Sequence, residues 1–140
     1  MSTILIADSG STKTAWCLLD GKTKKKIDTQ GISPYFLNGA QVVDILQKEL
    51  LPKIKKYEIK QVFFYGTGCS NPENVQMLKK AMKTVFGQAK ITIDHDLMGA
   101  ARALCKHSKG VVCILGTGSN SCFFNGKKIV KNSPGLGYVL

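Results

Sequence analysis

The chain has 140 residues, enough for one domain with a buried core and too few for two complete domains. Hydrophobic residues make up 44% and charged residues 21%, and no apolar run reaches the roughly 20 residues of a membrane-spanning helix, so collagen-like, disordered and membrane-spanning proteins are excluded. Basic residues outnumber acidic ones by 20 to 9, but Arg102 is the only arginine. Since base recognition and bidentate phosphate contacts favour arginine, we expect a solvated lysine surface and no nucleic-acid partner, with an anion as small as ATP as the alternative.

The cysteines and the start of the chain indicate a cytoplasmic protein. The five cysteines contain no C-x-x-C pair, and three of them lie in apolar, strand-like runs, where a reduced thiol behaves as a small hydrophobic group. The first residues lead directly into an apolar run without the basic region of an export signal. Neither histidine is spaced from a cysteine as in a zinc site, so we expect no metal held by His and Cys.

The first hundred residues predict three strands followed by alternating helices and strands. Apolar runs at 4–7 and 14–19 predict a β-hairpin with a polar first turn, and a third strand is expected near 26–29. The elements expected next are a helix over 40–50 with a break or new first turn at Pro52, a strand over 61–65, a helix capped by Asn71, a strand over 90–94 and a helix over 97–105. This order predicts an α/β fold with a mixed five-stranded sheet and helices on its faces.

The last thirty residues repeat the opening pattern of the chain. Strands are expected over 111–115, 121–124 and 127–131, and the run Val112–Ser119 matches Ile4–Ser11: an apolar strand followed by a hydroxyl residue, glycine and serine in register. Two copies of one motif suggest two equivalent half-sites for a single ligand. Since about 30 residues cannot complete a second domain, we expect an N-terminal fragment of a longer protein.

The turn after the first strand has the composition of a phosphate-binding loop. Ser9, Gly10, Ser11 and Thr12 place backbone N–H groups and hydroxyls side by side with little bulk, which suits an anion. A carboxylate beside phosphates repels them unless a divalent cation lies between, so Asp8 implies Mg²⁺. Lys13 and Thr12 are candidates for contacts to the terminal phosphate. A plain hairpin turn is the alternative for a single copy, and the second copy at Gly116, Thr117, Gly118 and Ser119 favours the phosphate loop.

Two common nucleotide-binding motifs are absent. Lys13 follows Gly10 at the wrong spacing for a P-loop. The segment 116–121 begins like G-x-G-x-x-G but lacks the third glycine and enters a strand instead of a helix. The chain is therefore neither a P-loop nor a Rossmann protein.

The two loops resemble the phosphate motifs of the acetate and sugar kinase, heat-shock chaperone and actin superfamily. Within it, the chain is most similar to the branch of N-acetylglucosamine kinase-like proteins and benzoyl-CoA reductase activator ATPases. The resemblance covers essentially the whole chain and includes three further motifs: Tyr65–Cys69, His95–Ala101 and Pro134–Gly137. It implies a ribonuclease H-like, actin-like ATPase domain over 1–108 and the opening strands of a second such domain over 109–140, with ATP and Mg²⁺ bound between the domains.

The resemblance also implies the residues that act on a sugar. The family's catalytic base, an Asp that opens the helix after the fifth strand, corresponds to Asp96. Accepting the proton of a sugar hydroxyl is chemistry suited to a carboxylate, and Asp94 is the rival. Asp96 is also placed as a helix N-cap, a role compatible with catalysis. The loop that contacts the sugar has Ser33 where the family usually has Asn, which puts an N-acetyl hexosamine in doubt; Ser33, Asn38 and Gly68 are the candidate sugar contacts.

An ATP-dependent sugar kinase with a small-molecule sugar substrate is the leading hypothesis, and this piece alone is expected to be inactive. An activator ATPase coupled to electron transfer would need an iron–sulfur cluster, for which only Cys69 and Cys105 lie outside strands. A metal-dependent nuclease would use Asp8 with Asp94 or Asp96 but would leave the second hairpin without a role. A noncatalytic nucleotide sensor is the remaining alternative, and a homodimer is left open.

Overall fold

The computed structural model describes residues 2–116 and 118–133 and divides into two compact units, Met1–His95 and Asp96–Leu140. Compactness assigns the helix that follows the fifth strand to the second unit, whereas the sequence predicts a domain boundary after residue 108. The assignment of these units to ATPase domains stays a prediction. Each unit is described by itself below.

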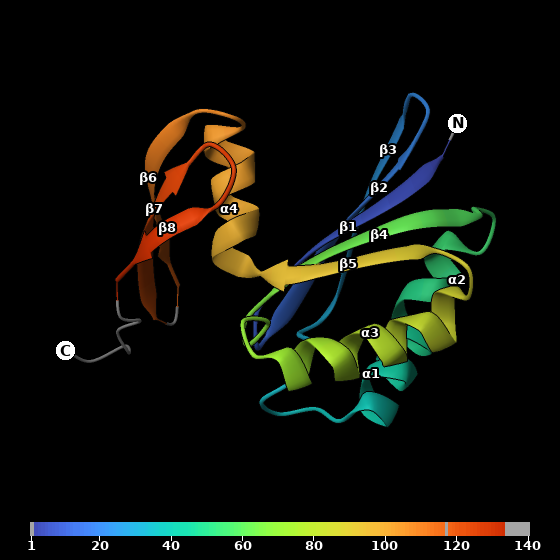
Figure 1. The fold of residues 1–140 in the computed structure, drawn as a ribbon. Helices are drawn as coiled ribbons and strands as arrows, with labels where there is room; N and C mark the ends of the chain where they lie inside the picture. Colours follow the sequence, from blue (N-terminus) through green and yellow to red (C-terminus); the bar gives the residue numbers. More distant parts are fainter. Residues whose placement is uncertain (1, 117, 134–140) are drawn as a thin grey trace. The chain divides into compact units, whose positions relative to one another are not determined.

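The first unit contains the predicted mixed five-stranded sheet, in the order β3-β2-β1-β4-β5 (Figure 1). Its strands are β1 (Thr3–Ser9), β2 (Lys13–Asp20), β3 (Thr23–Gln30), β4 (Ile59–Gly66) and β5 (Lys90–His95). The first three strands pair antiparallel as a meander, whereas β4 and β5 add to β1 in parallel. All five strands occur where the sequence predicts them. The mixed sheet, with helices between its later strands, confirms the α/β fold class.

The helices of the first unit follow the predicted order with one difference. They are α1 (Gly39–Ile45), the π-helix η1 (Leu46–Leu50), α2 (Leu51–Ile54) and α3 (Pro72–Phe86). The single helix expected over 40–50 is therefore an α-helix continued by a π-helical turn, and Pro52 lies in the first turn of α2. Asn71 caps α3 as predicted, since its side-chain oxygen accepts hydrogen bonds from the backbone of Glu73 and Asn74.

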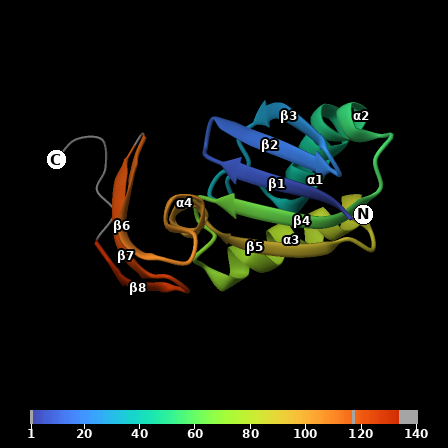
Figure 2. The same cartoon turned by 90° about the horizontal axis from the view of Figure 1, so that it is seen from above.

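The core of the first unit lies between one face of the sheet and its helices (Figure 2). Alternate residues along each strand are buried, so that Leu5 and Ala7 of β1, Trp16 of β2 and Phe64 of β4 are at most 1% exposed. The Trp16 and Phe64 rings pack with centroids 6.1 Å apart. Along each strand, the residues that alternate with these buried ones lie on the other face of the sheet. That face carries the polar end of the first hairpin.

The outer edge of β3 is bonded to the helical segment η1–α2. The ammonium group of Lys25 donates to the carbonyl of Lys53 at 2.7 Å, and that of Lys53 donates to the carbonyl of Asp28 at 3.1 Å. Further along the strand, the backbone N–H of Gln30 donates to the Glu49 carboxylate at 2.8 Å. Side chains of the helices thus occupy backbone groups that an edge strand otherwise leaves open.

The second unit consists of α4 (Asp96–Cys105) and a three-stranded antiparallel sheet of β6 (Lys109–Leu115), β7 (Ser119–Asn125) and β8 (Ile129–Asn132). The helix packs on β6 and β7, where Val112, Cys122 and Phe124 are buried. On the opposite face Val111, Leu115 and Phe123 are exposed. The repeated strand–loop–strand pattern therefore does form a second hairpin, as predicted.

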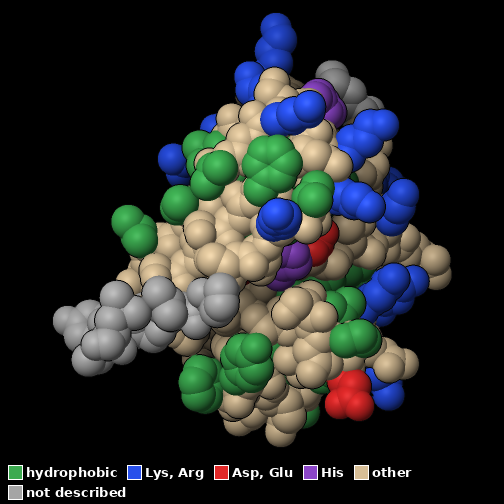
Figure 3. Space-filling view, turned by 60° about the vertical axis from the view of Figure 1, so that its left-hand side comes forward, with side chains coloured by type: hydrophobic (Ala, Val, Ile, Leu, Met, Phe, Trp, Pro, Cys, Tyr) green, Lys and Arg blue, Asp and Glu red, His purple; other side chains and the backbone are tan. Residues whose placement is uncertain are grey.

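The surface is rich in lysine, as the composition indicates. Figure 3 shows Lys and Arg side chains spread over the visible face rather than gathered at one place. Among the described helices, none has the length and apolar character required to cross a bilayer.

Candidate functional site

The first Gly/Ser loop closes the β1–β2 hairpin and is held from three sides. The Gly10 N–H donates to the carbonyl of Lys13 at 2.9 Å, which sets the turn. The N–H of Thr67, after β4, donates to the carbonyl of Ser9 at 3.2 Å, and that of Gly31, after β3, donates to the carbonyl of Thr12 at 3.0 Å. Gly10, Ser11 and Thr12 are exposed. The backbone turn is thus fixed by its neighbours while its outer side stays open to a ligand.

Gly31 is a part of this site that the sequence reasoning missed. A β-carbon on Gly31 would lie 2.3 Å from the Ser11 carbonyl oxygen and 2.6 Å from that of Gly10. Any other residue would therefore push the loop away. The only signal in the sequence is a glycine directly after the third strand, which cannot by itself show that another backbone segment approaches it.

The hydroxyl of Ser9 lies inside the protein rather than at the ligand side of the loop. Ser9 is 1% exposed, and its oxygen is 2.6 Å from that of Thr14 and donates to the carbonyl of Ile32 at 2.9 Å. The N–H of Ile32 in turn donates to both hydroxyls at 3.1 Å. This buried network joins the base of the loop to the segment after β3. A direct phosphate contact of Ser9 stays a prediction, as do those of its exposed neighbours.

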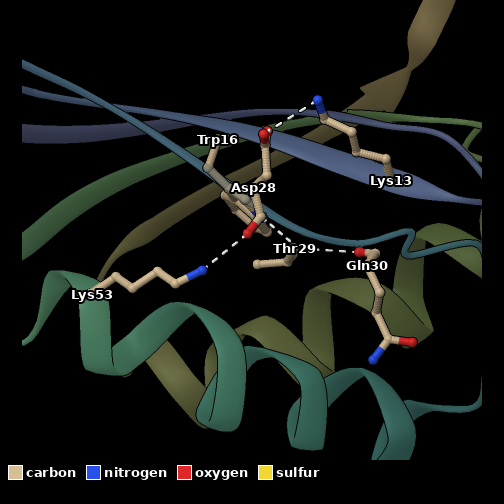
Figure 4. A network of polar contacts seen from close by, with 6 residues as sticks. All are labelled: Lys13, Trp16, Asp28, Thr29, Gln30 and Lys53. Carbon is tan, nitrogen blue, oxygen red and sulfur yellow. Dashed lines mark hydrogen bonds and ion pairs between the residues drawn. The ribbon is translucent and has the colours of Figure 1, made fainter.

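Lys13 forms an ion pair with Asp28 of the neighbouring strand at 3.3 Å (Figure 4). Both side chains are more than half exposed, so the pair is worth little to stability and Lys13 can exchange this partner for a phosphate. The strand that carries Asp28 is anchored beneath, where the Trp16 indole donates to the Thr29 hydroxyl at 3.0 Å. The predicted phosphate contact by Lys13 is therefore compatible with its placement.

Asp8 is the last but one residue of β1 and is exposed, on the sheet face opposite its buried neighbours Ala7 and Ser9. An exposed carboxylate next to an exposed Gly/Ser turn suits Mg²⁺, which takes one or two carboxylates and completes its shell with water and phosphate oxygens. The residues present therefore fit the cation that the sequence implies.

The three candidate sugar contacts are arranged differently from one another. Ser33 is buried, and its carbonyl accepts the N–H groups of Phe36 and Leu37. Gly68, with φ +74°, lies against this loop, since a β-carbon there would be 3.0 Å from Pro34 and Tyr35 side-chain atoms. Asn38 caps α1, accepting from the Gln41 N–H at 2.9 Å. The structure thus brings the Ser33 loop and Gly68 together, whereas the Asn38 side chain serves the helix.

The two candidate bases lie at the end of β5 and the start of α4. Asp94 is the last but one residue of β5, accepts the His95 N–H at 2.9 Å and lies 3.8 Å from the His95 imidazole. Asp96 is the first residue of α4, and its carboxylate accepts the N–H of Leu97 at 2.9 Å. Both are partly exposed. The helix-opening position expected for Asp96 is confirmed, and its catalytic role stays a prediction.

The second Gly/Ser loop joins β6 to β7. Gly116 and Gly118 are exposed, and the Gly116 N–H donates to the Gly118 carbonyl at 2.9 Å. Thr117 and the motif Pro134–Gly137 lie outside the described residues. Next to the loop, the side-chain oxygen of Asn120 is buried and has no hydrogen-bond partner among the described residues. Such an atom is costly unless a water or ligand donates to it, which makes Asn120 a candidate site residue that the sequence reasoning missed.

One of the two candidate cysteines for an iron–sulfur cluster lies in each unit. Cys69 is buried in the first unit, where its thiol is 3.7 Å from the Thr67 carbonyl, and Cys105 is partly buried at the end of α4. In the part of the chain that the structure describes, no group of three or more His, Cys, Asp or Glu residues is placed to hold a metal ion.

Comparison with solved structures identifies similar folds. A provisionally assigned N-acetylglucosamine kinase from Porphyromonas gingivalis is 43% identical, with a TM-score of 0.90, over 98% of this chain and 50% of that protein. The ethanolamine utilization protein EutJ from Carboxydothermus hydrogenoformans shares the fold, with 13% identity and a TM-score of 0.68 over 98% of this chain and 52% of that one. A ROK hexokinase from Thermus thermophilus also shares the fold, with 14% identity and a TM-score of 0.63 over 91% of this chain and 47% of that one. The chain spans about half the length of each. No family model matches it, and no curated protein does either.

Proposed function

Because this chain belongs to the N-acetylglucosamine kinase-like family of actin-like ATPases, we propose that it supplies one half of an ATP-dependent sugar kinase. The observation that carries the proposal is the open, rigidly supported turn at Gly10–Thr12 with the Asp8 carboxylate beside it. A support fixed before the ligand arrives is what phosphoryl transfer requires, since its catalysis consists of positioning and electrostatic stabilisation.

In the proposed reaction, a sugar hydroxyl attacks the γ-phosphorus of ATP. The new O–P bond forms as the bond to the β-phosphate oxygen breaks, ADP leaves, and the hydroxyl proton passes to the Asp96 carboxylate. The turn at Gly10–Thr12 and the loop at Gly116–Ser119 contact the phosphates, and Lys13 leaves Asp28 to reach the terminal one. Asp8 would hold Mg²⁺, which neutralises charge on the phosphate oxygens when bound.

The sugar is proposed to bind at the Ser33 loop and Gly68. Ser33 is fixed by the backbone bonds that its carbonyl accepts, and Gly68 lies against Pro34 and Tyr35. The free oxygen of Asn120 would accept a hydroxyl of a substrate or a water. Because Ser33 stands where the family usually has Asn, the sugar is to be identified with a panel of substrates.

The experiment uses the relative from P. gingivalis, of which this chain matches half. We expect the 140-residue chain alone to release no ADP in a sugar-dependent manner. A chimera that carries this chain in place of the matching half is then screened with hexoses and amino sugars. Sugar-dependent ADP release by the chimera supports the proposal, and release by the isolated chain contradicts the division of the site.

Substitution of the two candidate bases identifies the one that accepts the proton. In the active chimera, Asp96→Asn should lower kcat by about 10²- to 10⁴-fold with little change in KM. Asp44→Asn is the matched control, because Asp44 is exposed on α1 and forms an ion pair with Lys48 at 2.9 Å. If Asp94→Asn lowers kcat more than Asp96→Asn does, Asp94 is the base instead.

A further inference from the structure

The register of the five-stranded sheet places three aspartates and a tyrosine in one line across it. Asp28 on β3 pairs with Ala15 on β2, and Ala15 pairs with Asp8 on β1. Asp8 pairs with Tyr65 on β4, and Tyr65 pairs with Asp94 on β5. The order β3-β2-β1-β4-β5 makes these residues consecutive neighbours, as Figures 1 and 2 show for the strands. We call this set the carboxylate row.

The carboxylate row lies on the sheet face opposite the helices of the first unit. In β1, Ala7 and Ser9 on either side of Asp8 are buried, and in β4, Phe64 and Gly66 on either side of Tyr65 are buried. Because side chains alternate along a strand, Asp8 and Tyr65 share the other face. Tyr65 is only partly buried there. It therefore lies beside the open phosphate turn rather than in the core.

Tyr65 is the neutral member of a row that is otherwise acidic. Strand backbones in a sheet are about 4.8 Å apart, so the Tyr65 position on β4 has the Asp8 position on one side and the Asp94 position on the other. The negative charge of Asp28 is compensated by the Lys13 ammonium group at 3.3 Å. The Asp94 carboxylate accepts a hydrogen bond from the His95 N–H at 2.9 Å. A phosphate group near these carboxylates needs donors, and a phenol extends farther from the sheet than an aspartate and carries an O–H.

Resting on the proposed function, we propose that the Tyr65 hydroxyl donates a hydrogen bond to the γ-phosphoryl group of bound ATP. On one side of Tyr65 lies Asp8, which belongs to the phosphate end of the site. On the other lies Asp94, one residue before His95 and two before the proposed base. The transferred group must pass between the nucleotide and the acceptor, and its oxygens carry the negative charge of the transition state. A fixed neutral donor at that point stabilises this charge without adding a competing cation.

The test compares Mg·ATP with Mg·ADP, which differ by the group that Tyr65 is proposed to contact. Each nucleotide is titrated into the chimera, which contains both halves of the proposed site, and binding is followed by titration calorimetry. We expect the unsubstituted chimera to bind Mg·ATP more tightly than Mg·ADP, and Tyr65→Phe to reduce that preference about tenfold through loss of a charged hydrogen bond. Tyr57→Phe is the matched control: it removes the same atom from a ring that precedes β4 and lies under Lys56, and it should leave the preference unchanged.

The outcomes separate the two proposals. A chimera that binds neither nucleotide overturns the phosphate turn, and the role of Tyr65 with it. A chimera that binds ATP, with Tyr65→Phe keeping the unsubstituted preference, overturns only the role of Tyr65. In the active chimera, Tyr65→Phe should lower kcat by about 100-fold while KM for the sugar changes less than about twofold. A merely structural role would instead lower the melting temperature and leave the nucleotide preference intact.

Discussion

The two Gly/Ser hairpins share a sequence pattern but have different surroundings. Beneath the first, Ser9 and Thr14 are buried at the base of the turn, and Gly31 supports it from below. In the second, Leu115 is 86% exposed, and a β-carbon on Gly116 would meet nothing within 4 Å. The same local chemistry therefore makes a hairpin in both places. The rigidity of the turn comes from segments distant in sequence.

The largest expected effect comes from removing a core ring under the first hairpin. Phe64 is fully buried against Trp16, so Phe64→Ala should lower the free energy of unfolding by about 4 kcal/mol. The matched change in the second sheet, Phe123→Ala, removes a ring that is 38% exposed and should cost less than about 1.5 kcal/mol. Urea unfolding followed by circular dichroism measures both. Equal losses would mean that the second sheet is packed as tightly as the first.

A β-carbon under the first loop should have the next largest effect. Gly31→Ala places that atom 2.3 Å from the Ser11 carbonyl oxygen, and we expect a loss of about 3 kcal/mol in unfolding free energy. Nucleotide binding should weaken as well, because the turn must move. Gly116→Ala provides the control in the second loop and should change stability by less than about 0.5 kcal/mol. A stable Gly31→Ala protein that binds Mg·ATP normally would show that the loop can move away from the added β-carbon at little cost in free energy.

The buried hydroxyl network should contribute less than the packing. Thr14→Val removes a hydroxyl bonded to Ser9 and Ile32 and should lower the unfolding free energy by about 1–2 kcal/mol. Ser121→Ala is the counterpart in the second hairpin, where the Ser121 hydroxyl meets that of Ser133 at 2.8 Å in an exposed pair. Its loss should be below about 0.5 kcal/mol. A neutral Thr14→Val would indicate that Ser9 finds another partner.

Thiol labelling distinguishes the two faces of the second sheet without changing stability. Cys113 is exposed, whereas Cys122 is 4% exposed, and burial, followed by the nearby Cys105 and Cys113 thiols, raises the pKa of Cys122. A raised pKa leaves less thiolate at a given pH, so Cys122 should react slowly until the pH exceeds the ordinary thiol range. Iodoacetamide labelling across a pH series, read by peptide mass spectrometry, gives both rates. Cys122 labelling as fast as Cys113 would contradict the burial of this face.

Local patterns in the sequence predict the elements well, because caps, turns and apolar spacing act over a few residues. The cap at Asn71, the new first turn at Pro52 and both hairpins are examples. Periodicity alone cannot distinguish an α-helix from the π-helical turn at Leu46–Leu50, since both keep an apolar face toward the core.

The sequence predicts the loops of the candidate site, but it does not predict the residues that hold these loops in place. The roles of Gly31 and Tyr65 depend on which residues of other strands lie opposite them, and strand register is set by long-range pairing. The inward hydroxyl of Ser9 and the capping amide of Asn38 show the same limit. A residue's type indicates what it can bind, and only its neighbours decide what it does bind.

The bonding of β3 to the helical segment beside it has a consequence for how the protein behaves at high concentration. An open edge of a sheet invites a strand from another molecule, and this is a common route to aggregates. Here Lys53 and Glu49 occupy backbone groups along that border, and lysines at 24–26 add charge that repels a second copy. These contacts and charges disfavour self-association by strand addition at β3. Replacing the lysines of this segment by neutral residues should therefore lower the solubility of the protein.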